Sequence, residues 1–175
     1  KLQSFVFMPV FGLNNGMVPI IAYNYGAGHK DRVIKTIKHS VAYGVGIMFA
    51  GLLVMHIFPA QLMRMFDAEE SLIAIGAPAL ETISLSFVFA GFCIVAGSVF
   101  QALGNGVYSM IVSVARQMCV LLPVAKLLSL SGEVTLIWWA FPIAELASVL
   151  LTSYFLVRIY RKVICHIGEP VVQDA

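Results

Sequence analysis

Three charged side chains, Glu81, Arg116 and Glu145, lie inside long apolar stretches of the sequence. Ionisable groups in such surroundings are costly, so they usually face a protein interior or an aqueous cavity and pair with one another. Because one cation cannot neutralise two carboxylates, we hypothesise that Arg116 binds one of them. Burial disfavours the charged form of the other, which would then take up a proton or a cation. The alternative is a buried salt bridge with a second carboxylate hydrogen-bonded to a neighbour.

Two amide side chains, Asn14 and Asn15, lie between two glycines in the first apolar stretch. Uncharged amides in a hydrocarbon environment need hydrogen-bond partners from facing helices, water or a ligand. The pair therefore predicts either a helix-packing contact or a cavity lining, and the sequence leaves both open. Met8 and Phe11 nearby could supply an adaptable apolar wall for varied cations.

Motifs for metal binding or hydrolysis are absent from the sequence. His39 and His56 are seventeen residues apart, which is not a helical ligand spacing. The sequence contains no HExxH, GxSxG or Walker motif. Cys93, Cys119 and Cys165 lack the close spacing of a disulfide framework or a CxxC metal site. We therefore expect no enzyme activity, no metal site and no cofactor.

The composition indicates that these residues belong to a membrane protein. Of 175 residues, 60% are apolar and 11% are charged, whereas about 25% are charged in an ordinary soluble domain. So few charged side chains cannot cover the surface of a soluble domain of this size. The net charge of +2 is too small to indicate a nucleic-acid footprint. We expect membrane lipid around the chain and no nucleic-acid partner.

Five segments are long and apolar enough to cross a bilayer. A spanning helix needs about 20 mostly apolar residues to cross about 30 Å of hydrocarbon. Lipid cannot satisfy lone backbone groups, and the alternation of barrel strands is absent, so these segments must be helices. We predict an all-α polytopic membrane helix bundle, with the three charged residues near the same mid-depth. The spans are expected at about 2–25, 34–59, 72–103, 107–128 and 134–157.

Prolines lie inside or at the ends of all five predicted spans. An internal proline frees a carbonyl four residues earlier and bends its helix, and bent helices suit moving parts. Proline and glycine are also commoner in membrane helices than in soluble ones, so each proline has a general explanation as well. The prolines are Pro9, Pro19, Pro59, Pro78, Pro123 and Pro142.

Lysine and arginine are unevenly divided between the two ends of the predicted spans. The first loop, the start of the second span and the carboxyl end carry seven, and the opposite side carries three. The positive-inside rule therefore predicts a cytoplasmic first loop and carboxyl terminus. Five spans then put residue 1 outside, which we interpret as a fragment of a longer plasma-membrane protein. We expect residues 1–162 to form one transmembrane lobe and residues 163–175 a cytoplasmic tail.

Several runs of this sequence resemble a known transporter family. The run FMPVFGLNNG at residues 7–16, continuing to residue 27, resembles the eighth span and following loop of multidrug and toxic compound extrusion (MATE) transporters. Runs that look like spans ten to twelve of that family are FAGF to QALG at 89–104, Arg116-Gln117 with Leu122-Pro123, and WWAFP at 138–142 with Glu145. The resemblance covers about residues 1–162.

The resemblance implies a twelve-span exporter of two six-helix lobes, in which this chain supplies most of the carboxyl-terminal lobe. Such proteins export cationic amphipathic compounds in exchange for protons or sodium ions, and the coupling ion would be bound mainly in the amino-terminal lobe. Organic cations would be the substrates, and the amino-terminal lobe the main protein partner. The residues expected in the substrate cavity or its polar network are Asn14, Asn15, Gln101, Arg116 and Glu145, with Glu81 as a further member.

Two other functions are compatible with the same helical plan. A related flippase or exporter of lipid-linked or polysaccharide precursors would need a larger and more cationic groove for phosphates. Arg116 is the one basic residue expected at depth, which disfavours this function. The other is a five-helix structural membrane subunit that assembles with a partner.

Overall fold

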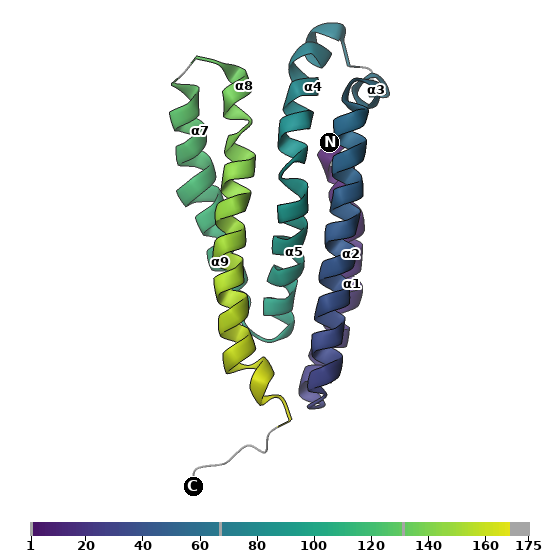
Figure 1. The fold of residues 1–175 in the computed structure, drawn as a ribbon, viewed down its shortest axis with the longest axis vertical. Coiled ribbons are helices and arrows are strands. Elements are labelled where there is room, and N and C mark those ends of the chain that lie inside the picture. The colour runs from purple at the N-terminus through teal and green to yellow at the C-terminus, as the bar shows by residue number, and fades with distance from the viewer. Residues whose placement is uncertain (1, 67, 131, 169–175) are drawn as a thin grey trace.

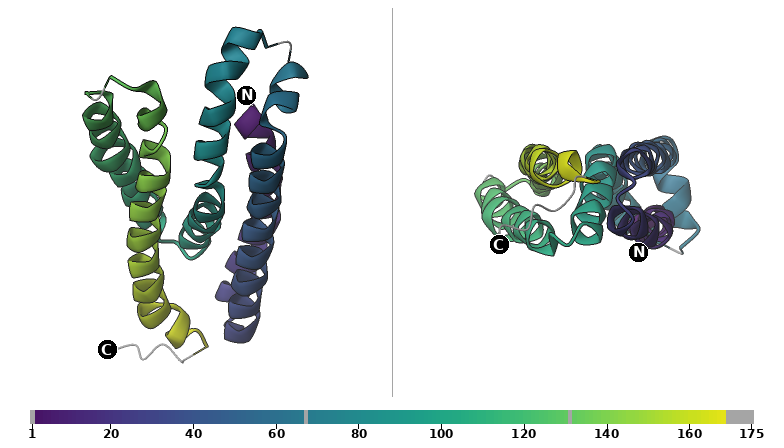
Figure 2. Two further views of the ribbon diagram at one scale, coloured as in Figure 1. Left: turned by 45° about the horizontal axis from the view of Figure 1, so that its top comes forward. Right: turned by 90° about the horizontal axis from the view of Figure 1, so that it is seen from below.

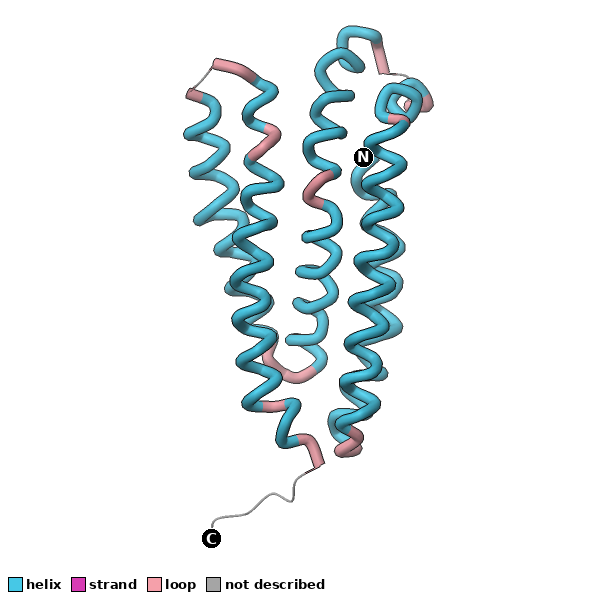
Figure 3. Tube along the Cα trace, in the orientation of Figure 1, coloured by secondary structure: helices cyan, strands magenta, loops and turns pink. Residues whose placement is uncertain are grey.

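The computed structural model describes residues 2–66, 68–130 and 132–168, and among these residues it contains helices and no strand (Figure 3). The all-α prediction is therefore confirmed. The elements in chain order are α1 (Leu2–Gly26), α2 (Lys30–Ile57), α3 (Pro59–Arg64), α4 (Glu70–Ser84), α5 (Phe87–Ala102), α6 (Gly106–Val114), the π-helix η1 (Ala115–Leu121), α7 (Leu122–Ser129), α8 (Val134–Ile137), α9 (Ala140–Lys162) and the 3-10 turn η2 (Ile164–His166).

The helices have the length and composition that a membrane requires. Four continuous stretches qualify, namely Leu2–Gly26, Lys30–Ile57, Gly106–Ser129 and Val134–His166, and α4 with α5 makes a fifth if the bent pair counts as one span. Large apolar side chains face outward, including Leu130 at 78% and Leu150 at 75% exposure. A soluble monomer rarely exposes so much apolar surface. Residues 169–175 of the predicted tail lie outside the described residues.

The predicted third span is bent rather than straight. The chain turns by 53° between α4 and α5, at Leu85 and Ser86. The hydroxyl of Ser84 donates to the carbonyl of Glu81 at 2.8 Å, and that of Ser86 donates to the carbonyl of Ile83 at 2.6 Å. The Ile83 carbonyl also accepts from the Ser86 N–H at 3.0 Å, so both carbonyls have partners and the helix can break at membrane depth without exposing them to lipid.

Prolines change the helical pattern in the last two spans. Pro123 has no N–H and therefore cannot continue the ordinary i→i−4 hydrogen bonds. Just before it, the Leu122 N–H donates five residues back, to the Gln117 carbonyl within η1. Pro142 likewise cannot donate to the Trp138 carbonyl, which instead accepts from Phe141 at 3.3 Å. The short break between α8 and α9 is the result (Figure 3).

The central helix of the bundle is α5. Figures 1 and 2 place it between the antiparallel pair α1 and α2 on one side and α9 on the other, and it contacts all three. Two glycines let α2 and α5 approach closely. A Cβ atom on Gly44 would lie 2.6 Å from Cγ2 of Val95, and one on Gly91 would lie 2.8 Å from Cγ of Met48. Small residues at such crossings are typical of membrane helix pairs.

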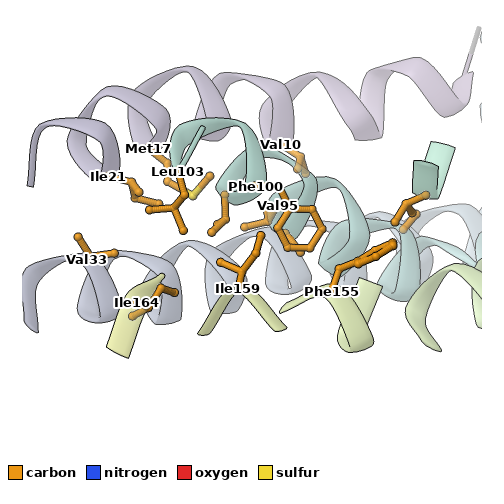
Figure 4. Close-up of a cluster of buried hydrophobic side chains, with 14 of the residues drawn as sticks. Val10, Met17, Ile21, Val33, Val95, Phe100, Leu103, Phe155, Ile159 and Ile164 are labelled. Carbon is orange, nitrogen blue, oxygen red and sulfur yellow. The ribbon is translucent and has the colours of Figure 1, made fainter. Parts of the chain in front are cut away.

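The buried apolar core joins α1, α2, α5 and α9 along much of their length, and Figure 4 shows part of it. Val95 and Phe100 of α5 lie at its centre and are fully buried. Tyr108 of α6 stacks on Phe155 of α9 with ring centroids 4.6 Å apart. The core therefore holds α5 against α1, α2 and α9, and α1, α5 and α9 also border a cavity.

Candidate functional site

A partly enclosed cavity of about 850 Å³ lies between α1, α5, the α6–η1 helix and α9. No residue of α2 lines it. Its wall combines aromatic side chains with hydroxyl, thiol and amide groups and one ion pair. A cavity of this volume is in the range that accommodates a drug-sized molecule.

The ion pair joins η1 to α9 at the cavity wall. Nη1 of Arg116 donates to Oε1 of Glu145 at 2.6 Å. The Glu145 side chain is only 8% exposed, whereas that of Arg116 is 42% exposed. The second carboxylate oxygen, Oε2, is buried and accepts no hydrogen bond from any described residue. The pair is therefore electrically neutral but leaves one acceptor atom of Glu145 unused.

The π-helix determines which side chains of the fourth span face the cavity. Ser109, Val112 and Arg116 follow one another at intervals of three and four residues and line the cavity together. Within η1 the wider turn places Gln117 on the same wall as Arg116. π-segments inserted in α-helices are frequent at functional sites.

One buried face of α9 supplies the adjoining wall. Glu145, Ser148 and Thr152 are spaced three and four residues apart, so they lie above one another on a helix. The Ser148 hydroxyl donates to the Ala144 carbonyl at 2.9 Å, and the Thr152 hydroxyl donates to Sγ of Cys93 on α5 at 3.7 Å. These bonds satisfy the two hydroxyls, so on this face only the Glu145 carboxylate has a buried atom without a partner among the described residues.

The remaining walls come from α5 and α1. Gln101 of α5 donates from Nε2 to the Ser109 hydroxyl at 3.1 Å. Asn14 of α1 is 7% exposed, and its Oδ1 atom is buried without a partner among the described residues. Phe7 and Phe11, one helical turn apart, extend the wall of α1 with aromatic rings. The cavity thus offers aromatic surface beside several hydrogen-bond acceptors.

The structure brings five of the six predicted site residues to one cavity. These five are Asn14, Asn15, Gln101, Arg116 and Glu145. Glu81 lies on α4, half-buried, and does not line the cavity. The bend between α4 and α5 explains this placement, because it turns the helix that carries Glu81 by 53° from the one that lines the cavity.

Sequence reasoning did not single out several cavity residues. Cys93, Gln117, Ser148 and Thr152 all line the wall. The signal that could have found Ser148 and Thr152 is their spacing from Glu145, since residues three, four and seven positions apart share one helix face. Met8, a predicted wall residue, is 63% exposed and is not part of the lining.

Comparison with known proteins identifies the family. The family model described as MatE matches residues 1–127, more than two thirds of the chain. The chain belongs to the MatE family. The resemblance drawn from residues 7–16 and 89–104 is therefore confirmed. MatE membership together with the apolar helices makes the chain part of an integral membrane protein.

Two named MatE-type relatives illustrate how much of a whole protein is present. The chain is 25% identical over 163 residues to the multidrug export protein MepA of Staphylococcus haemolyticus, covering 93% of this chain and 35% of MepA. It is 23% identical over 125 residues to the probable multidrug resistance protein NorM of Thermotoga maritima, covering 71% of this chain and 27% of NorM. The chain spans about a third of the length of the curated relatives that it matches.

Two solved MatE-type structures share the fold. The structure of the MATE multidrug transporter DinF-BH, solved as a ligand complex, matches 93% of this chain and 36% of that protein, with a TM-score of 0.81 and 32% identity. An inward-facing multidrug resistance MATE family transporter of the MOP superfamily matches 91% of this chain and 38% of its own, with a TM-score of 0.82. At 16% identity, the second match shows the fold alone.

Proposed function

We propose that the protein is a secondary active multidrug efflux antiporter that exports cationic amphipathic compounds in exchange for protons or sodium ions. It would act as a transporter rather than an enzyme, with its carboxyl terminus in the cytoplasm. The observation that carries the proposal is the cavity between α1, α5, η1 and α9, which combines aromatic walls with an Arg116–Glu145 pair. The relatives support it, because they are named as multidrug export or resistance proteins.

The cavity wall has the chemistry that a lipophilic cation needs. The rings of Phe7, Phe11 and Phe141 border the cavity and present apolar surface and negative ring faces. The unused Oε2 atom of Glu145 adds an acceptor, and the cavity lining contains no other carboxylate among the described residues. A cation could therefore be held by stacking and by charge without displacing Arg116.

Antiport requires that the binding of the ion and the binding of the substrate are each coupled to the change of access state. Each must bind one access state better than the other, or neither can drive the exchange. A proton or sodium ion on the Glu145 carboxylate would weaken its attraction for both Arg116 and a bound cation. We expect the main coupling site in the amino-terminal lobe. Glu145 would therefore contribute to substrate affinity, and that affinity would respond to the ion bound in the amino-terminal lobe.

The cavity offers little support for transport of phosphate-bearing precursors. Arg116 is the only basic side chain in the lining among the described residues, and Glu145 already accepts from it at 2.6 Å. A phosphate group would therefore meet no uncommitted cation. Drug-type cations fit the wall better than lipid-linked anions.

Efflux from cells tests the proposal. The full-length gene product is expressed in bacteria that lack their own exporters, and accumulation of a fluorescent lipophilic cation is followed while the proton and sodium gradients are collapsed separately. We expect Glu145→Gln to lower efflux about tenfold, because a charged hydrogen-bonding group contributes about 1.5–3 kcal/mol. Glu81→Gln is the matched control, since Glu81 is half-buried in the same protein but does not line the cavity.

Three results would contradict the proposal. The first is efflux that survives the collapse of both gradients, because a secondary antiporter has no other energy source. The second is an equal effect of Glu145→Gln and Glu81→Gln at equal protein abundance. The third is export of anionic but not cationic dyes.

A further inference from the structure

A second groove, of about 650 Å³, runs between α1 and α2. It shares no lining residue with the cavity described above. The α2 wall carries Arg32, Lys35 and His39 together with Thr36, Ser40 and Tyr43, and the α1 wall consists of apolar residues, two glycines and Asn24. The α1 wall is therefore mostly apolar, and the basic end of the groove, at Arg32 and Lys35, lies near the start of α2.

The basic end lies at the level of lipid headgroups. The 28 residues of α2 make a helix of about 42 Å, which exceeds a hydrocarbon core of about 30 Å. Arg32 and Lys35 follow the first residue of α2 by two and five positions, or about 3 and 8 Å. Both side chains therefore stand in the interfacial layer, on the side that the positive-inside rule assigns to the cytoplasm.

In the apolar part of the groove, its floor is the uncovered backbone of α1 at Gly12 and Gly16. No heavy atom lies within 4 Å of a Cβ atom built on Gly12 or Gly16. Ile20 continues the same lining toward the basic end, at 50% exposure. From residue 12 to residue 20 the trough is about 12 Å long, which matches a stretch of extended hydrocarbon chain rather than a compact ion.

At the polar end of the groove, two cations have no ion-pair partner and one hydrogen-bond acceptor has no donor among the described residues. No ion pair engages Arg32 or Lys35 within the described residues. Asn24 lines this end at 8% exposure; its Nδ2 donates to the Ile20 carbonyl at 2.8 Å, but its buried Oδ1 has no partner among the described residues. Two uncommitted cations beside an unused acceptor fit an anion that also carries a hydroxyl group.

We propose that this groove binds an anionic glycerophospholipid of the cytoplasmic leaflet. Arg32 and Lys35 hold the phosphate, the headgroup hydroxyl lies toward Asn24, and an acyl chain follows the floor at Gly12 and Gly16. Basic pockets between membrane helices on this side of the bilayer are suited to anionic headgroups. The proposal does not depend on transport by the other cavity.

Lipid titration of the purified full-length protein tests the charge contacts. Binding of dioleoyl phosphatidylglycerol in neutral detergent is measured by native mass spectrometry, with dioleoyl phosphatidylcholine as the zwitterionic comparison. We expect Arg32→Gln combined with Lys35→Gln to weaken phosphatidylglycerol binding about thirtyfold, because each interfacial cation contributes a factor of about five. Lys38→Gln is the matched control, since Lys38 is exposed on the same helix but does not line the groove. It should change the affinity less than twofold.

A groove-filling variant tests the acyl-chain contact. Gly16→Leu places a side chain where the structure has open space, and leucine favours a helix more than glycine does. We expect phosphatidylglycerol affinity to fall at least tenfold while thermal stability in detergent alone does not fall.

Four outcomes would overturn the proposal. Equal binding of phosphatidylcholine would show that charge plays no part, and an equal effect of Lys38→Gln would show that the groove is not the site. Displacement of the lipid by glycerol 3-phosphate alone would show a site for soluble phosphates. Loss of the folded protein on Gly16→Leu would show that another part of the protein occupies the groove.

Discussion

Removing one partner of the Arg116–Glu145 pair should have very different consequences depending on which partner is removed. Arg116→Gln leaves the Glu145 carboxylate, 8% exposed, without its cation. A buried charge that loses its partner costs about 3–5 kcal/mol. Glu145→Gln instead leaves a guanidinium that is 42% exposed and can turn toward the cavity, so we expect a cost of about 1–2 kcal/mol.

The double variant makes the reasoning quantitative. With both residues changed to glutamine, no unpaired charge remains, and the two amides can still bond to each other. Its free energy of unfolding should therefore be about 2 kcal/mol higher than that of Arg116→Gln alone. This recovery, added to the cost of about 1–2 kcal/mol for Glu145→Gln alone, gives a coupling energy of about 3–4 kcal/mol between two residues in direct contact.

Unfolding of the purified protein in mixed micelles, by titration with a denaturing detergent, measures these free energies. The control is Arg64→Gln, because Arg64 and Glu70 form an ion pair of 3.1 Å whose side chains are 63% and 79% exposed. Such exposed pairs contribute about 0–1 kcal/mol. The reasoning is refuted if Arg116→Gln is no more destabilising than Arg64→Gln, or if adding Glu145→Gln to it restores nothing.

Two further predictions concern the packing of the helices. Gly44→Ala brings a Cβ within 2.6 Å of the fully buried Val95, whereas Gly46→Ala meets open space on the same helix. The free energy of unfolding in detergent should be about 1–3 kcal/mol lower for the first variant than for the second. Equal stability of the two variants would contradict the close crossing. Ser84→Ala removes the hydroxyl that satisfies the Glu81 carbonyl at the bend and should cost about 1 kcal/mol, measured the same way, whereas no loss would show that another group satisfies that carbonyl.

The sequence predicts the class of fold well, because the length of an apolar run decides whether it can span a bilayer. Breaks in the helices are harder to predict. Pro9 and Pro19 lie inside α1 without interrupting it, whereas α4 ends well after Pro78, where two serine hydroxyls bond back to the chain. A proline permits a bend, but neighbouring hydroxyls and packing decide its place.

The candidate site is predictable where a charge must find a partner. Arg116 and Glu145 are 29 residues apart in sequence and meet at 2.6 Å, because an unpaired charge at that depth is costly. Glu81 has a similar expected depth, but depth does not specify the direction in which a side chain points. Hydroxyls such as that of Thr152 cost little in a membrane helix, so the sequence alone gives no reason to assign them to a cavity wall.

The crossing of α2 and α5 links a remote surface to the cavity. Gly91 faces α2, while Cys93 and Gln101 of the same helix line the cavity on its other side. Added bulk at Gly44 would displace α5 as a rigid rod, because its core contacts are too tightly packed to absorb the change locally. Substitutions on α2, a helix that does not line the cavity, can therefore change the shape of the cavity wall formed by α5.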